Sequence, residues 1–305
     1  MNRLQSVAFQ YLKEAQIARR YYHSTLRMHR SHLGSLCGYT SKNILELERE
    51  DLQGWIDFQI GEAGESEKTI STIAYRFAGI RAFYAFMLKT GRIAVNPTDL
   101  VEVPETIAPD TIWLDEDQAE QLLAAPRRAQ LAGDIKSYRM NLDRLILELL
   151  YGSGLRVSEA IRLRTEDIFS SKPGNPRSRM VCIRSKQHGD RNVPLTLTCQ
   201  QALDAYLGDR PASSAANLLV SRRGFALKPD YFQAIVFDYT QRQQLDPRIS
   251  PHKLRHSFAM AQLARGIDLE SLRQLLGNRS IATLERYITP EETPSACCIP
   301  LFIPV

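Results

Sequence analysis

The chain has 305 residues, of which 44% are hydrophobic and 24% are charged. This composition is typical of globular proteins and excludes a disordered or collagen-like chain. No apolar run approaches the roughly 20 residues that a membrane helix needs, so we expect no membrane partner. The net charge of +5 is compatible with a nucleic-acid partner without establishing one.

The five cysteines are scattered and odd in number, and none forms a Cys-x-x-Cys pair. This pattern argues against a disulfide framework and against a cysteine-ligated zinc site. The N-terminal sequence Met-Asn-Arg-Leu-Gln lacks the apolar run of a signal peptide. We therefore expect a reduced, cytoplasmic protein, associated with the nucleoid if DNA is its partner.

The first hundred residues read as a helical unit. Helical spacing of apolar residues predicts helices over 3–37, 48–59 and 68–90, with Gly91 as the last helix stop. Residues 1–42 carry seven Lys or Arg and one acid. A solvated helix face and a DNA-binding surface explain this charge equally well.

An extended linker is expected over residues 101–112, which contain two prolines and no helical period. A second domain then begins near Trp113. Asp115 is a plausible N-cap with Gln118 as its capping-box partner, which predicts a helix over 115–125. A further helix is predicted over 138–151.

The period changes to two between residues 179 and 197, where Val181 and Ile183, and then Val193 and Leu195, alternate with polar positions. This predicts a β-hairpin that turns at residues 187–190. Helical patterns return from about Pro229. Residues 291–305 form an apolar, proline-containing tail, which we expect to pack either on its own domain or on a neighbouring subunit.

Arg156 lies in Gly-Ser-Gly-Leu-Arg-Val-Ser-Glu-Ala, directly after an apolar helix. The glycines predict a turn that places Arg156 at a helix start, where free amides also attract anions. Glu159 could brace the arginine side chain. The alternative is an ordinary surface arginine at a helix junction.

Four further residues complete a set that could cleave and reform a phosphodiester bond without a metal. Arginines hold phosphates with permanently charged forks, a lysine can protonate a leaving alkoxide, and a tyrosine can form a covalent intermediate. Each taken alone is a weak signal, because hairpin lysines and helix tyrosines are mostly structural. They are Lys186, His252, Arg255 and Tyr287.

Three segments in this order resemble the boxes of the tyrosine recombinase (phage-integrase) family. The segment around Arg156 is similar to the first arginine box, and Pro-His-Lys-Leu-Arg-His-Ser-Phe-Ala, with His252 and Arg255, to the second. Leu-Leu-Gly-Asn-Arg-Ser-Ile-Ala-Thr-Leu-Glu-Arg-Tyr, which ends at Tyr287, is similar to the tyrosine box. Residues from Lys68 to Asn96-Pro97 are similar to the core-binding domain. Because the chain begins almost directly with that domain, the resemblance favours a Xer-like or transposon-resolving type.

The resemblance implies a mainly α-helical protein with a small β-sheet or hairpin in its catalytic domain. It also implies a two-domain, C-shaped clamp around DNA. We expect a helical, SAM-like core-binding domain over 1–100, the linker over 101–112, a catalytic domain over 113–290 and the apolar tail over 291–305.

The resemblance also assigns roles. Tyr287 is the nucleophile that forms a 3′-phosphotyrosine, while Arg156 and Arg255 neutralise the phosphate charge. Lys186 is the expected general acid, His252 a base or hydrogen-bond partner, and Glu159 a supporting residue. No cofactor or metal is implied, because the ester conserves the bond energy.

Asn278 departs from the family pattern, in which this position is normally histidine or tryptophan. Asparagine keeps an N–H donor for the phosphate but is shorter and does not ionise. We therefore expect activity to survive in weakened form.

The implied partner is double-stranded DNA with a specific recombination site, bound by a homo-tetramer on two duplexes. Whether an accessory protein is required stays open, as does the choice among integration, excision and dimer resolution. Two alternatives are a type IB topoisomerase-like enzyme, which religates the same strand, and a non-catalytic DNA-binding relative. Candidate DNA contacts are basic residues on predicted helices: Arg19, Arg27, Lys68, Arg76, Arg81 and Lys253.

Overall fold

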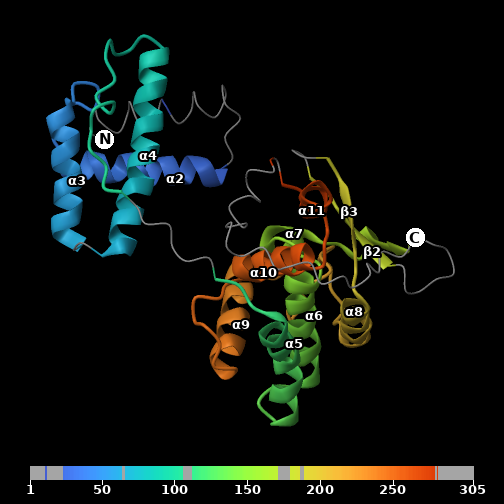
Figure 1. Ribbon diagram of the computed structural model, residues 1–305. Coiled ribbons are helices and arrows are strands. Elements are labelled where there is room, and N and C mark those ends of the chain that lie inside the picture. The colour runs from blue at the N-terminus through green and yellow to red at the C-terminus, as the bar shows by residue number, and fades with distance from the viewer. Residues whose placement is uncertain are drawn as a thin grey trace. The chain divides into compact units, whose positions relative to one another are not determined.

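A computed structural model describes residues 11, 23–63, 66–105, 112–170, 179–185, 189–278 and 280. The chain divides into two compact units, Met1–Asp110 and Thr111–Val305. The described residues are mainly helical with one small antiparallel sheet (Figure 1). The expected fold class, mainly α-helical with a small sheet in the second unit, is confirmed.

The first unit contains helices α2 (His23–Tyr39), α3 (Arg49–Ala63) and α4 (Glu67–Lys89). Their apolar faces enclose an aromatic core that includes Trp55 and Phe77. The Tyr84 hydroxyl donates to the carbonyl of Ile44 at 2.6 Å, which fixes the loop between α2 and α3 against α4. Burial of large aromatic rings is a strong favourable contribution to the stability of such a unit.

The beginning of the expected linker packs on the first unit. Val101 is buried in its core, and the amide of Glu102 donates to the Gln53 side chain of α3 at 3.0 Å. On the other side of the linker, the amide of Leu114 donates to the Ser257 hydroxyl at 2.8 Å. Residues 106–111 lie outside the described residues.

The second unit begins with α5 (Glu116–Leu131), α6 (Ser137–Leu147) and a π-helical turn, η1 (Glu148–Gly152). The predicted capping box is present, with Asp115 accepting from the Gln118 amide. The predicted end of this helix at 125 is wrong, because α5 continues through the buried Pro126. Core packing of this turn offsets the hydrogen bond that proline removes.

The remaining helices are α7 (Val157–Arg162), η2 (Thr165–Asp167), α8 (Leu197–Asp209), α9 (Pro229–Arg242), α10 (Pro251–Ala264) and α11 (Leu269–Leu276). Asp143 ties α6 to α9, because its buried carboxylate accepts from the hydroxyls of Tyr231 and Tyr239 at 2.7 and 2.8 Å. Helix α6 therefore lies at the centre of the unit, in contact with α5, α8 and α9.

The sheet has three antiparallel strands in the order β1 (Ile168–Ser170), β2 (Arg179–Ile183) and β3 (Arg191–Pro194). The predicted hairpin is β2–β3, and its register pairs Ile183 with Arg191. Val181 and Val193 face the core as the alternation predicted. Strand β1 and helix α8 are additions to the predicted elements.

Candidate active site

Arg156 follows the π-helical turn and is the N-cap of α7, as the glycine pattern predicted. π-helical turns are frequent at functional sites. Gly154 has a φ of +62°, and a Cβ atom there would lie 2.4 Å from the Phe258 ring. Only glycine satisfies both the left-handed backbone and this close approach, so the turn that presents Arg156 depends on it.

Arg255 enters the same site from the second turn of α10, a helix that Ser250 caps and Pro251 begins. Its side chain is only 7% exposed. The guanidinium donates to the carbonyl of Gly154 at 2.7 Å and to that of Leu276 at 2.6 Å. The second arginine therefore holds together the turn before α7 and the end of α11.

Asn278 joins the two arginines. Its Oδ1 accepts from Arg156 at 2.8 Å and from Arg255 at 3.2 Å. Because guanidinium groups only donate, the amide oxygen must face them and the NH2 group must point away. The site thus keeps an N–H donor at this position, held beside two positive charges.

Glu159 lies among the arginines. Its carboxylate accepts from Arg156 at 3.0 Å and lies 3.6 Å from Arg255. Burial by itself raises the pKa of Glu159, but hydrogen bonds and positive charge from Arg191, with smaller contributions from Arg156 and Arg255, lower it overall. Glu159 is thus an ionised brace for the cluster.

Arg191 on β3 is a member of this cluster that lies outside the three sequence motifs. It forms a two-pronged contact with Glu159 at 2.9 Å for both nitrogen–oxygen pairs. The alternation of the strand could have indicated this residue. Arg191 and Val193 are two residues apart, so they share the face of the strand that packs on the core. A charged residue on that face required a buried partner.

His252 lies on the first turn of α10, three residues before Arg255, and its side chain is exposed. Partial desolvation, and then the charges of Arg255, Lys253 and Arg156, lower the pKa of His252. The lowered pKa favours the neutral imidazole, which can accept a proton.

Two predicted catalytic residues, Lys186 and Tyr287, lie outside the described residues, as does Arg19. Their roles stay predictions. The side chain of Lys68 is also outside the described part of the chain. The other candidate DNA contacts have different surroundings: Arg27 is exposed, Arg76 donates to Gln59 at 2.8 Å, Arg81 lies 5.4 Å from the Phe77 ring centroid, and Lys253 is half-buried.

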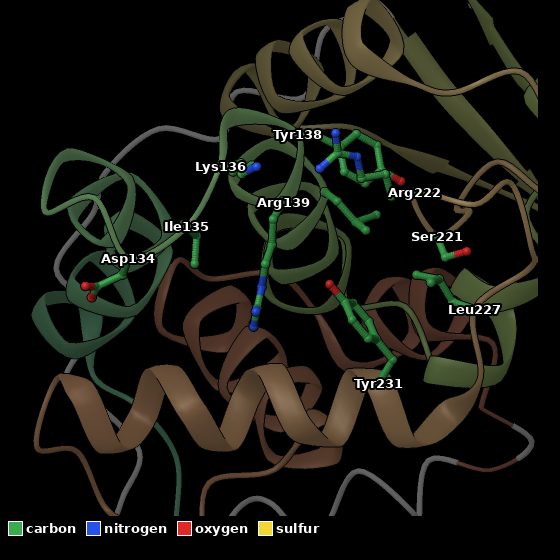
Figure 2. A pocket seen from close by; sticks show the side chains of 10 residues that line it. Asp134, Ile135, Lys136, Tyr138, Arg139, Ser221, Arg222, Leu227 and Tyr231 are labelled. Carbon is green, nitrogen blue, oxygen red and sulfur yellow. The ribbon is translucent and has the colours of Figure 1, made fainter.

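A cavity of about 380 Å3 lies at the N-terminal end of α6 (Figure 2). Lys136, Arg139, Arg222 and Tyr231 contribute to its lining. The arginine cluster lies beyond the opposite end of α6, so the cavity is separate from it. Among the described residues, no group of three potential metal ligands occurs, and no helix is long and apolar enough to cross a membrane.

Comparisons with known proteins agree with this geometry. Residues 112–293 match the Phage integrase family, and residues 9–91 match the Phage integrase N-terminal SAM-like domain. The chain therefore belongs to the phage integrase family, and the resemblance to tyrosine recombinases is confirmed.

The similar relatives are of the Xer type. The chain is 31% identical over 281 residues to the tyrosine recombinase XerC of Xanthomonas campestris pv. campestris, covering 91% of this chain and 82% of that protein. It is 34% identical over 213 residues to XerC of Pelobacter propionicus, covering 70% of this chain and 66% of that protein. The fold is similar to the Tn1549 transposon integrase in complex with a circular intermediate DNA, with a TM-score of 0.71, 20% identity and coverage of 93% and 95%.

Proposed function

We propose that this protein is a site-specific DNA recombinase that cleaves and rejoins strands through a 3′-phosphotyrosine. The observation that carries the proposal is the convergence of Arg156 and Arg255 on one amide oxygen, that of Asn278. Three arginines surround a single carboxylate, that of Glu159, so positive charge remains beside Arg156 and Arg255. A phosphodiester is an anion whose oxygens match the geometry of these two guanidinium groups.

In the proposed reaction the Tyr287 oxygen attacks the scissile phosphorus and displaces the 5′ oxygen of the next nucleotide. Arg156 and Arg255 neutralise the additional charge on the phosphorane. Lys186 donates a proton to the departing 5′ oxygen, and His252, whose lowered pKa favours the neutral imidazole, accepts the proton of the tyrosine. The reverse reaction with a 5′ hydroxyl from another duplex completes the exchange.

The test is to incubate the protein with genomic DNA of its host, stop the reaction with detergent and sequence DNA that stays covalently attached. We expect adducts at one or a few loci, and none with Tyr287→Phe. The matched control is Tyr138→Phe, which removes a tyrosine hydroxyl that donates to the carbonyl of Val220, near the end of α6 away from the arginine cluster. Adducts of equal yield from wild type and Tyr287→Phe would contradict the assignment of the nucleophile.

Recombination and simple religation are distinguished by the products. Two labelled duplexes that carry the recovered locus should exchange strands, through a Holliday junction, in the presence of wild-type protein. A type IB topoisomerase-like enzyme would relax supercoiled DNA without joining the two labels. DNA binding without any adduct would indicate the non-catalytic alternative.

We infer further that four protomers act on two duplexes in the cytoplasm, and that the apolar tail, residues 291–305, docks on a neighbouring protomer. The tail lies outside the described residues, and its composition supports the inference, because an apolar segment is unfavourable in water. Deletion of 291–305 should abolish synapsis of two duplexes while leaving binding to one duplex. Intact synapsis after the deletion would exclude this role.

A further inference from the structure

Arg191 connects three parts of the catalytic unit through one side chain, which is 14% exposed. Its Nη1 and Nη2 donate to the two carboxylate oxygens of Glu159 on α7, each at 2.9 Å. Its Nε donates to the carbonyl of Leu275 on α11, also at 2.9 Å. Figure 1 shows α11 beside β3, the strand on which Arg191 lies. A contact with two parallel hydrogen bonds fixes both the orientation of the Glu159 carboxylate and its distance from the Arg191 guanidinium.

The first consequence concerns charge. Glu159 contacts Arg156 and lies near Arg255, so on its own it would cancel half of their combined positive charge. Arg191 supplies the matching positive charge and occupies both carboxylate oxygens. Two unit charges then remain for a phosphate in a largely buried site, where charges are weakly screened.

The second consequence concerns geometry. α11 ends at Leu276, and its C-cap Gly277, with a φ of +63°, turns the chain into Asn278. A Cβ atom at Gly277 would lie 2.8 Å from Nη1 of Arg191. The arginine therefore lies directly against the turn that presents Asn278 to the other two guanidinium groups.

The third consequence concerns the hairpin. Arg191 is paired with Ile183 in the sheet, so it marks the base of the β2–β3 turn that contains Lys186. Asp190 closes this base by accepting from the Ser185 amide at 3.0 Å. One residue thus links the base of that turn to α7 and α11.

We propose that Arg191 is a positioning residue: it neutralises and holds Glu159, so that Arg156 and Arg255 keep their charge and their orientation for the scissile phosphate. The inference rests on the proposed function of those two arginines. Arg191 does not itself need to touch DNA.

The experiment compares Arg191→Gln, Arg191→Lys, Glu159→Gln and the double variant Glu159→Gln with Arg191→Gln. It measures single-turnover formation of the phosphotyrosine adduct on a labelled duplex that carries the locus recovered above, at saturating protein. We expect Arg191→Gln to slow adduct formation about 100-fold, as small displacements of catalytic groups do. DNA affinity should change little, and Arg191→Lys should recover part of the rate because it restores the charge.

The double variant separates this role from a structural one. If Arg191 acts by neutralising Glu159, removal of the carboxylate charge should make the double variant faster than Arg191→Gln. If Arg191 only anchors the fold, loss of a second anchor should make the double variant slower, and that result would overturn the proposal. Thermal unfolding of each variant shows whether the protein is folded at the assay temperature.

The matched control is Arg179→Gln, which removes an arginine from the same sheet that pairs with Asp204 rather than with the cluster. It should react like wild type. Wild-type protein that forms no Tyr287-dependent adduct would contradict the proposed function and this inference together. Wild-type adducts with an equal rate for Arg191→Gln would contradict this inference alone.

Discussion

At the scale of single residues, His256 makes the stability of the second unit depend on pH. It is buried on α10 with an edge-to-face contact to Trp113, and burial, followed by the charges of Lys253 and His252, lowers the pKa of His256 to about 4. The unfolded chain takes up this proton near pH 6.5, whereas the folded protein does not until about pH 4. Its contribution is therefore fully present above pH 6.5 and is lost as the pH falls towards 4.

We predict that His256→Phe flattens the pH dependence of unfolding between pH 6.5 and 4. The lowered pKa of His256 corresponds to a change in the free energy of unfolding of about 3 kcal/mol. Urea unfolding at several pH values measures this change in wild type and in His256→Phe. Subtracting one pH profile from the other removes the contribution of carboxylates that titrate in both proteins. Parallel profiles would show that His256 does not titrate in this way.

Asn278 gives a second prediction at this scale. Asn278→Ala should slow adduct formation by roughly 100-fold, the usual effect of losing one donor to a developing charge. Asn278→Asp should be slower still, because it keeps the oxygen that Arg156 and Arg255 contact but adds a negative charge beside the phosphate. Single-turnover rates of adduct formation test both variants. An alanine variant as fast as wild type would exclude Asn278 as a donor to the phosphate.

At the scale of elements, the end of α11 determines where the arginines find their partners. Gly277→Ala should lower the free energy of unfolding by about 1 kcal/mol or more, because alanine disfavours the left-handed backbone. It should also slow adduct formation, since the new methyl group would displace Arg191. Gly266→Ala is the matched control: its φ is +83°, but no atom lies within 4 Å of the new methyl group.

These two variants separate backbone strain from crowding of the site. Both should lose stability in thermal unfolding, but only Gly277→Ala should lose cleavage rate. An equal loss of rate in both would show that the contact between Arg191 and the turn has no special importance.

At the scale of the whole molecule, we expect binding to DNA to depend steeply on salt, because contacts to phosphates release counterions. Arg27 and Arg81 are exposed on helices of the first unit. If each contacts a phosphate, Arg27→Gln and Arg81→Gln should each lower the slope of log affinity against log salt by about 0.9. Arg248→Gln, which removes an exposed arginine paired with Asp246, should leave the slope unchanged.

Several helices were predictable because their signals are local. Asp115 and Gln118 define the start of α5 through hydrogen bonds between neighbours in the sequence. The end of α5 was not predictable from the sequence. Proline destabilises a helix interior, but core contacts in the folded protein offset this penalty at Pro126. Strand β1 has three residues, too few for an alternating pattern to be recognised.

The family, the mainly helical fold with its hairpin, and the grouping of Arg156, Arg255 and Asn278 could all be predicted from contiguous motifs along the chain. The contacts of the Asn278 oxygen with both arginines, and of Arg191 with Glu159, became visible only in the folded protein. These contacts join residues that are far apart along the chain. Glu159 and Arg191 are separated by 32 residues, so their contact exists only once β3, α7 and α11 pack together.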